Sequence, residues 1–126
     1  MSRLRTVLVV AAGLILIASS AAHSLLGWPQ LSLRLNTEHV SLDLVAGLAM
    51  GWHFAGVAML TLGLLTLWFA SAAQRPLSVR MPVGIIGIAY LAFGAGAAAA
   101  FGFDFFQVVF LVPGALLTVA ALMPDR

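Results

Sequence analysis

Residues 37–71 read TEHVSLDLVAGLAMGWHFAGVAMLTLGLLTLWFAS. From Leu44 to Ala70 this run is apolar, interrupted only by glycines, threonines, the pair Trp52-His53 and Trp68. A bilayer is crossed by about 20 such residues, since a helix rises ~1.5 Å per residue. The two tryptophans would lie about 24 Å apart along a helix, close to the separation of the two interfacial aromatic belts. The run therefore predicts a membrane-spanning helix that extends beyond the bilayer.

The composition of the whole chain agrees with a lipid-embedded protein. Of its 126 residues, 63% are hydrophobic and 8% are charged, whereas soluble domains carry about 25% charged residues. The mean hydropathy is +1.12. The basic residues are six arginines, which lie near predicted helix ends, so we expect no nucleic-acid partner. The lack of cysteine excludes disulfides, thiolate nucleophiles and iron-sulfur clusters.

Apolar runs before and after the central one predict an all-α integral membrane protein, an antiparallel four-helix bundle in contact with the lipid bilayer. One domain covers residues 1–126, with spans at about residues 4–23, 44–71, 83–101 and 105–123.

The residues between the first two spans predict an outer cap, from Trp28 to Asp43. Gly27, Trp28 and Pro29 are expected to end the first helix. In residues 30–36 leucine alternates with polar residues, and we predict an irregular segment on the membrane surface because an isolated strand would have no partner. Asn36 or Thr37 is then expected to cap the second helix.

The first span also resembles a secretory signal, with Arg3 and Arg5 before an apolar run and small residues after it. We expect it to be retained as an anchor, because the run is long for a signal and cleavage would leave three spans. With four spans, five of the six arginines fall on one side and Arg34 on the other. The positive-inside rule then places both termini in the cytoplasm. The arginine-only, alanine- and glycine-rich composition indicates a bacterial inner membrane.

Two features of the last two spans concern helix packing. Ala92, Gly96 and Ala100 form a small-xxx-small register that lets another helix approach closely, so we expect the third span to be the central helix. Pro113 and Gly114 lie near the middle of the fourth span and predict a kink that could act as a hinge.

Asp104 and Gln107 have the spacing of a reciprocal helix cap at the start of the fourth span.

The candidate ligand site is a polar group near the outer boundary. His23 and His53 are expected at similar depth on adjacent helices, where two imidazoles could hold a metal or a haem iron, or line a quinone site. Asp43 or Glu38 could orient an imidazole from above, and Tyr90 could contact a substrate from the third span. The alternative is that the histidines are interfacial residues bonded to hydroxyls, carbonyls or water. Two ligands are too few for structural zinc, and Asp43 would lie about 15 Å from His53 along the helix.

Motifs for catalysis are not found in the sequence: there is no P-loop, nucleophile elbow or HExxH. We therefore expect a protein that is not an enzyme and acts as an accessory or assembly subunit, as a homo-oligomer or with a membrane-protein partner. Two alternatives remain open. One is a haem, quinone or metal binding module that uses His23 and His53, and the other is a small oligomeric transporter.

Overall fold

The computed structural model describes residues 2–71 and 76–124, which are helical along almost their whole length. The elements are α1 (Arg3–Ala22), a π-helical turn (His23–Gly27), α2 (Trp28–Thr37), α3 (Leu42–Ser71), α4 (Pro76–Phe101), a 3₁₀ turn (Phe105–Gln107) and α5 (Val108–Leu122). Four segments of this part of the chain are long and apolar enough to cross a membrane: Arg3–Thr37, Leu42–Ser71, Arg80–Phe101 and Phe105–Leu122. The predicted all-α, four-span membrane bundle is confirmed.

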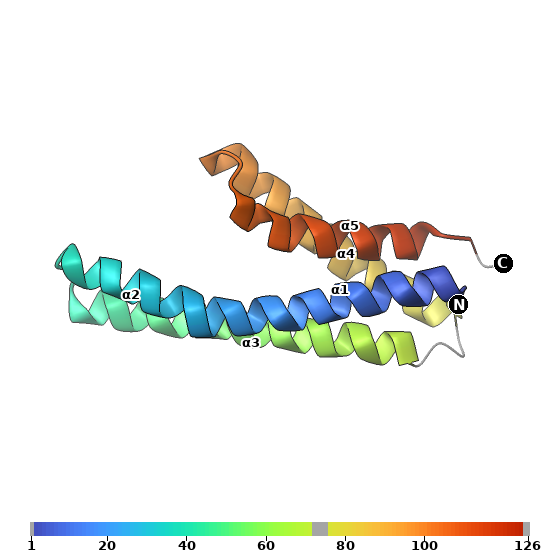
Figure 1. Ribbon diagram of the computed structural model, residues 1–126, viewed down its shortest axis with the longest axis horizontal. Coiled ribbons are helices and arrows are strands. Elements are labelled where there is room, and N and C mark those ends of the chain that lie inside the picture. Colours follow the sequence, from blue (N-terminus) through green and yellow to red (C-terminus); the bar gives the residue numbers. More distant parts are fainter. Residues whose placement is uncertain (1, 72–75, 125–126) are drawn as a thin grey trace.

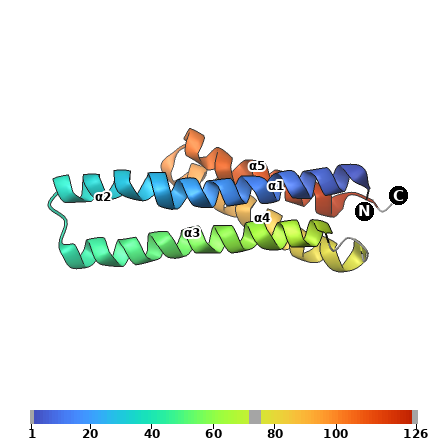
Figure 2. The same ribbon diagram turned by 60° about the horizontal axis from the view of Figure 1, so that its bottom comes forward.

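The helices form two antiparallel hairpins that share α1 as their common neighbour. Figures 1 and 2 show α1 and α2 running alongside α3, with α4 and α5 as the second hairpin. α1 packs against both α3 and α5, whereas α4 packs mainly against α5. The prediction that the third span is the central helix is therefore wrong, because the first span holds that place.

The contact between α1 and α3 is built from small residues repeated in steps of seven. Ser20 donates a hydrogen bond from its hydroxyl to the carbonyl oxygen of Gly56, at 2.7 Å. A Cβ added to Gly63 would lie 3.1 Å from the carbonyl oxygen of Gly13. A seven-residue repeat keeps one seam of each helix facing its partner, and small residues let the backbones approach. The repeat comprises Gly13, Ser20 and Gly27 on the first helix and Gly56, Gly63 and Ala70 on the second.

A second close approach joins α4 and α5. A Cβ added to Gly87 would lie 2.7 Å from the backbone nitrogen of Thr118, and one added to Gly114 would lie 3.0 Å from the carbonyl oxygen of Gly87. Gly87 and Gly94 are buried on this face, whereas the predicted packing residues are exposed on the opposite face. A Cβ added to Gly96 would meet nothing within 4 Å in the described chain, and the packing of Ala92, Gly96 and Ala100 against another subunit stays a prediction.

The first helix continues where the sequence predicted a stop. The backbone N–H of Trp28 donates to the carbonyl oxygen of His23, five residues earlier, so the helix widens into one π-helical turn before Pro29. Pro29 then occupies the first turn of α2, where its missing N–H is tolerated. The predicted helix end at Gly27 to Pro29 and the irregular segment at residues 30–36 are both wrong. Leu31 and Leu35, one turn apart, are the half-buried leucines of this helix.

The turn between α2 and α3 also corrects a prediction, because the next helix begins at Leu42 rather than at Asn36 or Thr37. Val40 donates its N–H to the carbonyl of Leu35 and His39 donates to that of Asn36. His39 has a φ of 54°. This is the geometry of a Schellman end with a left-handed residue, which satisfies carbonyls at the helix terminus.

Two arginines bind the end of α5 near the chain termini. The Arg5 guanidinium, only 2% exposed, donates to the carbonyl oxygen of Met123, and Nε of Arg80 donates to the carbonyl oxygen of Ala121 at 2.9 Å. Cations are favourable at a helix C-terminus, where the last carbonyls have no helical donors. Arg75 and Arg126 lie outside the described residues. The start of α1, the start of α4 and the end of α5 therefore lie at the same height along the bundle axis.

Because α1, α4 and α5 end at the same height on the arginine side, the longer helices extend further on the opposite side. The helix from Arg3 to Thr37 has 35 residues, or about 52 Å, against a hydrocarbon core of about 30 Å. α2 and the start of α3 extend past the hairpin of α4 and α5 in Figures 1 and 2. The predicted outer cap is thus a projecting helical hairpin.

The predicted helix N-cap between α4 and α5 is confirmed, since Asp104 and Gln107 form a capping box.

Candidate functional site

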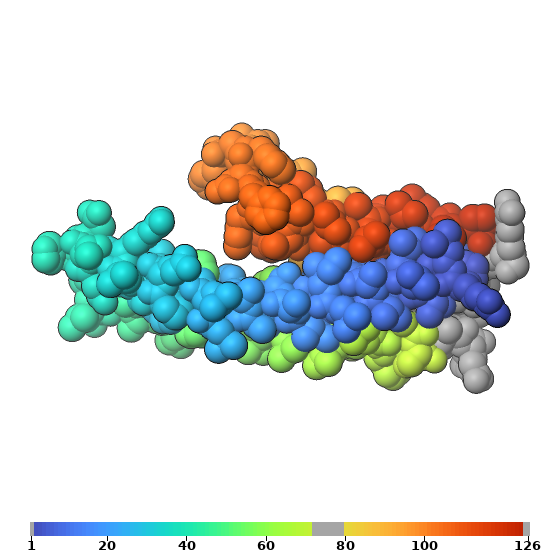
Figure 3. All heavy atoms as spheres, in the orientation of Figure 1, coloured from blue at the N-terminus to red at the C-terminus, as the bar shows by residue number. Residues whose placement is uncertain are grey.

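A cleft separates the first helix from the beginning of α5 on the side where the chain projects. Figure 3 shows the surface hollowed between the blue to cyan atoms of α1 and α2 and the orange atoms near the start of α5. The cleft has a volume of about 710 Å³. Its lining comes from three parts of the chain: Ala18, Ser19, Ala22, His23, Leu26, Gly27, Gln30, Leu31 and Arg34; Trp52 and Met59; and Phe105, Phe106 and Val109.

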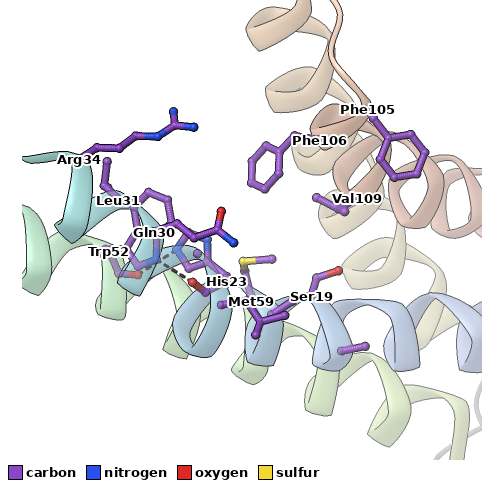
Figure 4. A pocket seen from close by; sticks show the side chains of 14 residues that line it. Ser19, His23, Gln30, Leu31, Arg34, Trp52, Met59, Phe105, Phe106 and Val109 are labelled. Carbon is purple, nitrogen blue, oxygen red and sulfur yellow. Dashed lines mark hydrogen bonds between the residues drawn. The ribbon is translucent and has the colours of Figure 1, made fainter.

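One wall of the cleft carries a row of polar side chains. Ser19, His23, Gln30 and Arg34 follow one another at intervals of about one, two and one turns, which places them on one face of the continuous helix. The row extends about 22 Å along the helix axis. Figure 4 shows Phe105, Phe106 and Val109 on the opposite side of the cleft. Apolar side chains lie between and beside these four on the same wall: Ala18, Ala22, Leu26, Leu31 and Met59. The cleft is therefore mainly apolar, with a row of four polar side chains on one wall.

His23 is held in place by Trp52 of α3. The imidazole and indole rings are stacked, with centroids 4.2 Å apart and planes 6° apart. Nε2 of His23 lies 3.0 Å from the carbonyl oxygen of Trp52, and the indole N–H donates to the carbonyl oxygen of His23 at 2.8 Å. Figure 4 draws both bonds as dashed lines. The reciprocal pair fixes the position and the orientation of the imidazole.

These bonds do not involve the second ring nitrogen of His23. A carbonyl oxygen only accepts hydrogen bonds, so Nε2 must carry the hydrogen that it donates to Trp52. In the neutral ring Nδ1 is then an acceptor with a free lone pair. Nδ1 is buried and has no hydrogen-bond partner within residues 2–71 and 76–124. Nδ1 is therefore an unsatisfied acceptor enclosed by protein atoms.

The structure separates the two histidines that the sequence predicted as a pair. His53 is exposed and contacts the ring of Trp28, at 5.6 Å between centroids. Trp28 in turn lies 6.3 Å from Trp52. Each imidazole therefore contacts a different indole of one four-ring cluster, and His53 is not part of the cleft lining. The described chain has no group of three or more His, Cys, Asp or Glu side chains placed to hold a metal.

The remaining predicted residues lie away from the cleft. Asp43 is exposed in the first turn of α3. Tyr90 is buried between α4 and α5, with its ring 5.9 Å from that of Phe110. Pro113 and Gly114 are buried in α5, and Gly114 lies against α4. Among the predicted ligand residues, His23 alone lines the cleft.

Sequence reasoning missed Ser19, Gln30 and Arg34. Their spacing with His23 was visible in the sequence, but the predicted helix stop at Pro29 assigned the last two to a different segment. The residues of α5 that face them could not be aligned with α1 from the sequence, because no pattern gives the register of two spans that are far apart in the chain.

Comparison with protein-family models, curated proteins and solved structures finds no match to this chain. The function is therefore inferred from the geometry of the cleft.

Proposed function

We propose that this small multi-pass membrane protein binds a lipid-soluble small molecule in the cleft between α1–α2 and α5. The observation that carries the proposal is the cleft itself, whose lining is mainly apolar and carries one row of polar side chains. Its volume of about 710 Å³ falls within the ~300–1,000 Å³ typical of ligand sites. A molecule entering from the bilayer could leave its apolar part against Phe106 and Val109 and turn its polar part toward the row of polar side chains.

The proposed role is binding without catalysis. His23 is the titratable base of the cleft, and the described lining contains no carboxylate to pair with it. A general base usually needs such a partner to orient it and to stabilise its charged form. The hydrogen bond from His23 to a main-chain carbonyl orients the ring but supplies no charge.

Filling the cleft tests this proposal. Ala22 lines the cleft, and Ala21 beside it is exposed outside the lining. We expect Ala22→Phe to lower the amount of bound small molecule at least tenfold, since the ring would occupy the ligand volume, while Ala21→Phe leaves it unchanged. The measurement is mass spectrometry of organic extracts from the purified proteins, normalised to protein. Equal extracts from both variants and the wild type would contradict the proposal.

We infer a bacterial inner membrane and cytoplasmic termini for this site. Arg3, Arg5 and Arg80 at the level end support the orientation, with Arg34 on the projecting hairpin. Because the chain has no cysteine, single cysteines can report it. A cysteine at Glu38 is expected to react with a membrane-impermeant thiol reagent in cells whose outer membrane is permeabilised, and one at Ser2 only after the inner membrane is broken. The reverse pattern would contradict this orientation.

A second candidate function, that of an accessory or assembly subunit, is supported by the outer face of α4. Ala92, Gly96 and Ala100 are exposed, and a Cβ added to Gly96 would meet nothing within 4 Å. A small-xxx-small face of this kind lets a helix of another subunit approach closely. The partner would be a second copy or another membrane protein. The transporter alternative, with Pro113 and Gly114 as a hinge, stays a prediction.

A further inference from the structure

We infer that the cleft binds an amphiphile with an anionic headgroup, whose carboxylate or phosphate pairs with Arg34 while its hydrocarbon chain lies along the apolar lining. The inference rests on the proposed function and names the chemical class of its ligand.

The charge of the cleft comes from Arg34. Among the described residues that line the cleft there is no aspartate or glutamate to oppose an anion. The Arg34 side chain is exposed and has no ion pair or hydrogen bond within residues 2–71 and 76–124. Glu38, four residues later, lies at the C-cap of α2 and does not pair with it. A guanidinium presents a fork of N–H donors that matches two oxygens of a carboxylate or a phosphate.

Gln30 adds further donors beside Arg34. Residues four apart on a helix are neighbours on one face, and both of these residues are exposed and line the cleft. Figure 4 shows the Arg34 side chain extending from its helix toward the side on which Phe106 lies. The amide of Gln30 has two N–H groups. A headgroup at this end of the cleft can therefore place one oxygen on the amide and others on the guanidinium.

The depth of the cleft in the membrane suits an amphiphile. Arg5 lies at the arginine end of the bundle, where we place one membrane boundary. Along the helix from Arg5, Ala22 lies about 25 Å away and Arg34 about 43 Å away. The hydrocarbon core is about 30 Å thick and the headgroups lie beyond it. Long side chains on a helix point back toward its N-terminus, so the guanidinium is directed from above toward the headgroup layer.

The rest of the lining suits a hydrocarbon chain but cannot select one. The residues at hydrocarbon depth are mainly apolar: Ala18, Ala22, Leu26, Met59 and Val109. A lipid chain that moves from the bilayer into this part of the cleft exchanges one apolar surrounding for another. The difference in affinity between two amphiphiles with the same chain therefore comes from their headgroups, and the charge of Arg34 favours the anion.

The inference is tested with two amphiphiles that differ only in headgroup charge. Dibrominated stearate and its methyl ester have the same chain, and bromine quenches the fluorescence of tryptophan, of which Trp52 lines the cleft. The detergent-purified full chain is titrated with each at about pH 8, where the carboxylate is ionised. We expect half-maximal quenching at about a fivefold lower mole fraction of the stearate, the factor that an accessible ion pair supplies. Arg34→Gln is expected to bring the ratio to about one, and Arg34→Lys to keep most of it.

The matched control moves the arginine by one position. Leu33 is exposed and lies outside the lining, and its side chain points about 100° away from that of Arg34. Leu33→Arg combined with Arg34→Leu keeps the net charge and the composition but takes the guanidinium away from the cleft. We expect this double variant to behave like Arg34→Gln. Recovery of the fivefold ratio in the double variant would overturn the inference, as would an unchanged ratio in Arg34→Gln.

The source of the anion is decided by competition. Hexadecyl phosphate and palmitate are each added to wild-type protein that holds the brominated stearate. Stronger displacement by the phosphate assigns the cleft to a lipid phosphate, and stronger displacement by palmitate assigns it to a fatty acid. Failure of both to displace the stearate would overturn the inference. None of these results would touch the proposed function, which fails only if Ala22→Phe leaves the extracted small molecules unchanged.

Discussion

Replacing Gly63 with leucine is expected to lower the free energy of unfolding by about 2–3 kcal/mol, because the new side chain has no space in the contact between α1 and α3. The first atom of that side chain would already lie 2.8 Å from Cγ1 of Ile17 and 3.1 Å from the carbonyl oxygen of Gly13. Side-chain atoms could rotate away, but the Gly13 carbonyl and the backbone nitrogen of Ile17, also at 3.1 Å, belong to the helix itself. The two helices would have to separate.

Gly51→Leu provides the control on the same helix. A Cβ at Gly51 meets nothing within 4 Å, and leucine has a higher helix propensity than glycine by roughly 0.5–1 kcal/mol. Thermal denaturation in detergent, followed by circular dichroism, should show a lower Tm for Gly63→Leu and an unchanged or higher Tm for Gly51→Leu. Equal Tm values for the two variants would show that the seven-residue seam does not hold the helices together.

Gly96→Leu is expected to break an assembly while leaving the isolated chain intact. The added side chain meets no atom of its own chain within 4 Å of its Cβ, but it would hold a partner helix away from Ala92 and Ala100. We expect size-exclusion chromatography with light scattering to give a larger mass for the wild-type assembly and the monomer mass for Gly96→Leu, at an unchanged Tm.

The comparison for that experiment is Gly47→Leu, another glycine with nothing within 4 Å, placed on the projecting part of α3. This variant should keep the wild-type mass. A wild-type protein that elutes as a monomer and copurifies with no other membrane protein would contradict the accessory-subunit candidate, as would an assembly that survives Gly96→Leu.

The spans were predictable because their signal is local. Apolar runs such as residues 44–71 must be helical in lipid, where each backbone polar group needs an internal partner. The continuation through Pro29 was not predictable, because glycine and proline together are typical of a helix end, and only the bond from Trp28 to His23 shows how one wider turn accommodates them. The packing face of α4 was ambiguous for another reason. The helix has small residues on two faces, Gly87 and Gly94 on one and Ala92, Gly96 and Ala100 on the other, and the sequence does not say which face packs against α5.

The site was predictable to the extent that it follows from a single residue type. An imidazole near the end of a span is an expensive group that usually has a role, and His23 does line the cleft. His53 was predicted to share a ligand with His23, whereas the side chain that stacks on His23 belongs to the neighbouring residue, Trp52. Neighbouring residues on a helix point about 100° apart, so this difference of one residue separates a side chain of the cleft from one outside it.

The bond between Arg5 and the carbonyl of Met123 has a consequence for biosynthesis. Arg5 belongs to α1 and Met123 follows α5, so the two groups can meet only after both of these helices have been made. α1 and α3 can pair earlier, since their seam needs nothing from the later helices. During that interval the side of α1 that will meet α5 faces lipid or the insertion machinery. Closure of the bundle therefore has to wait for the synthesis of α5, whereas the hairpin of α1 and α3 can form before it.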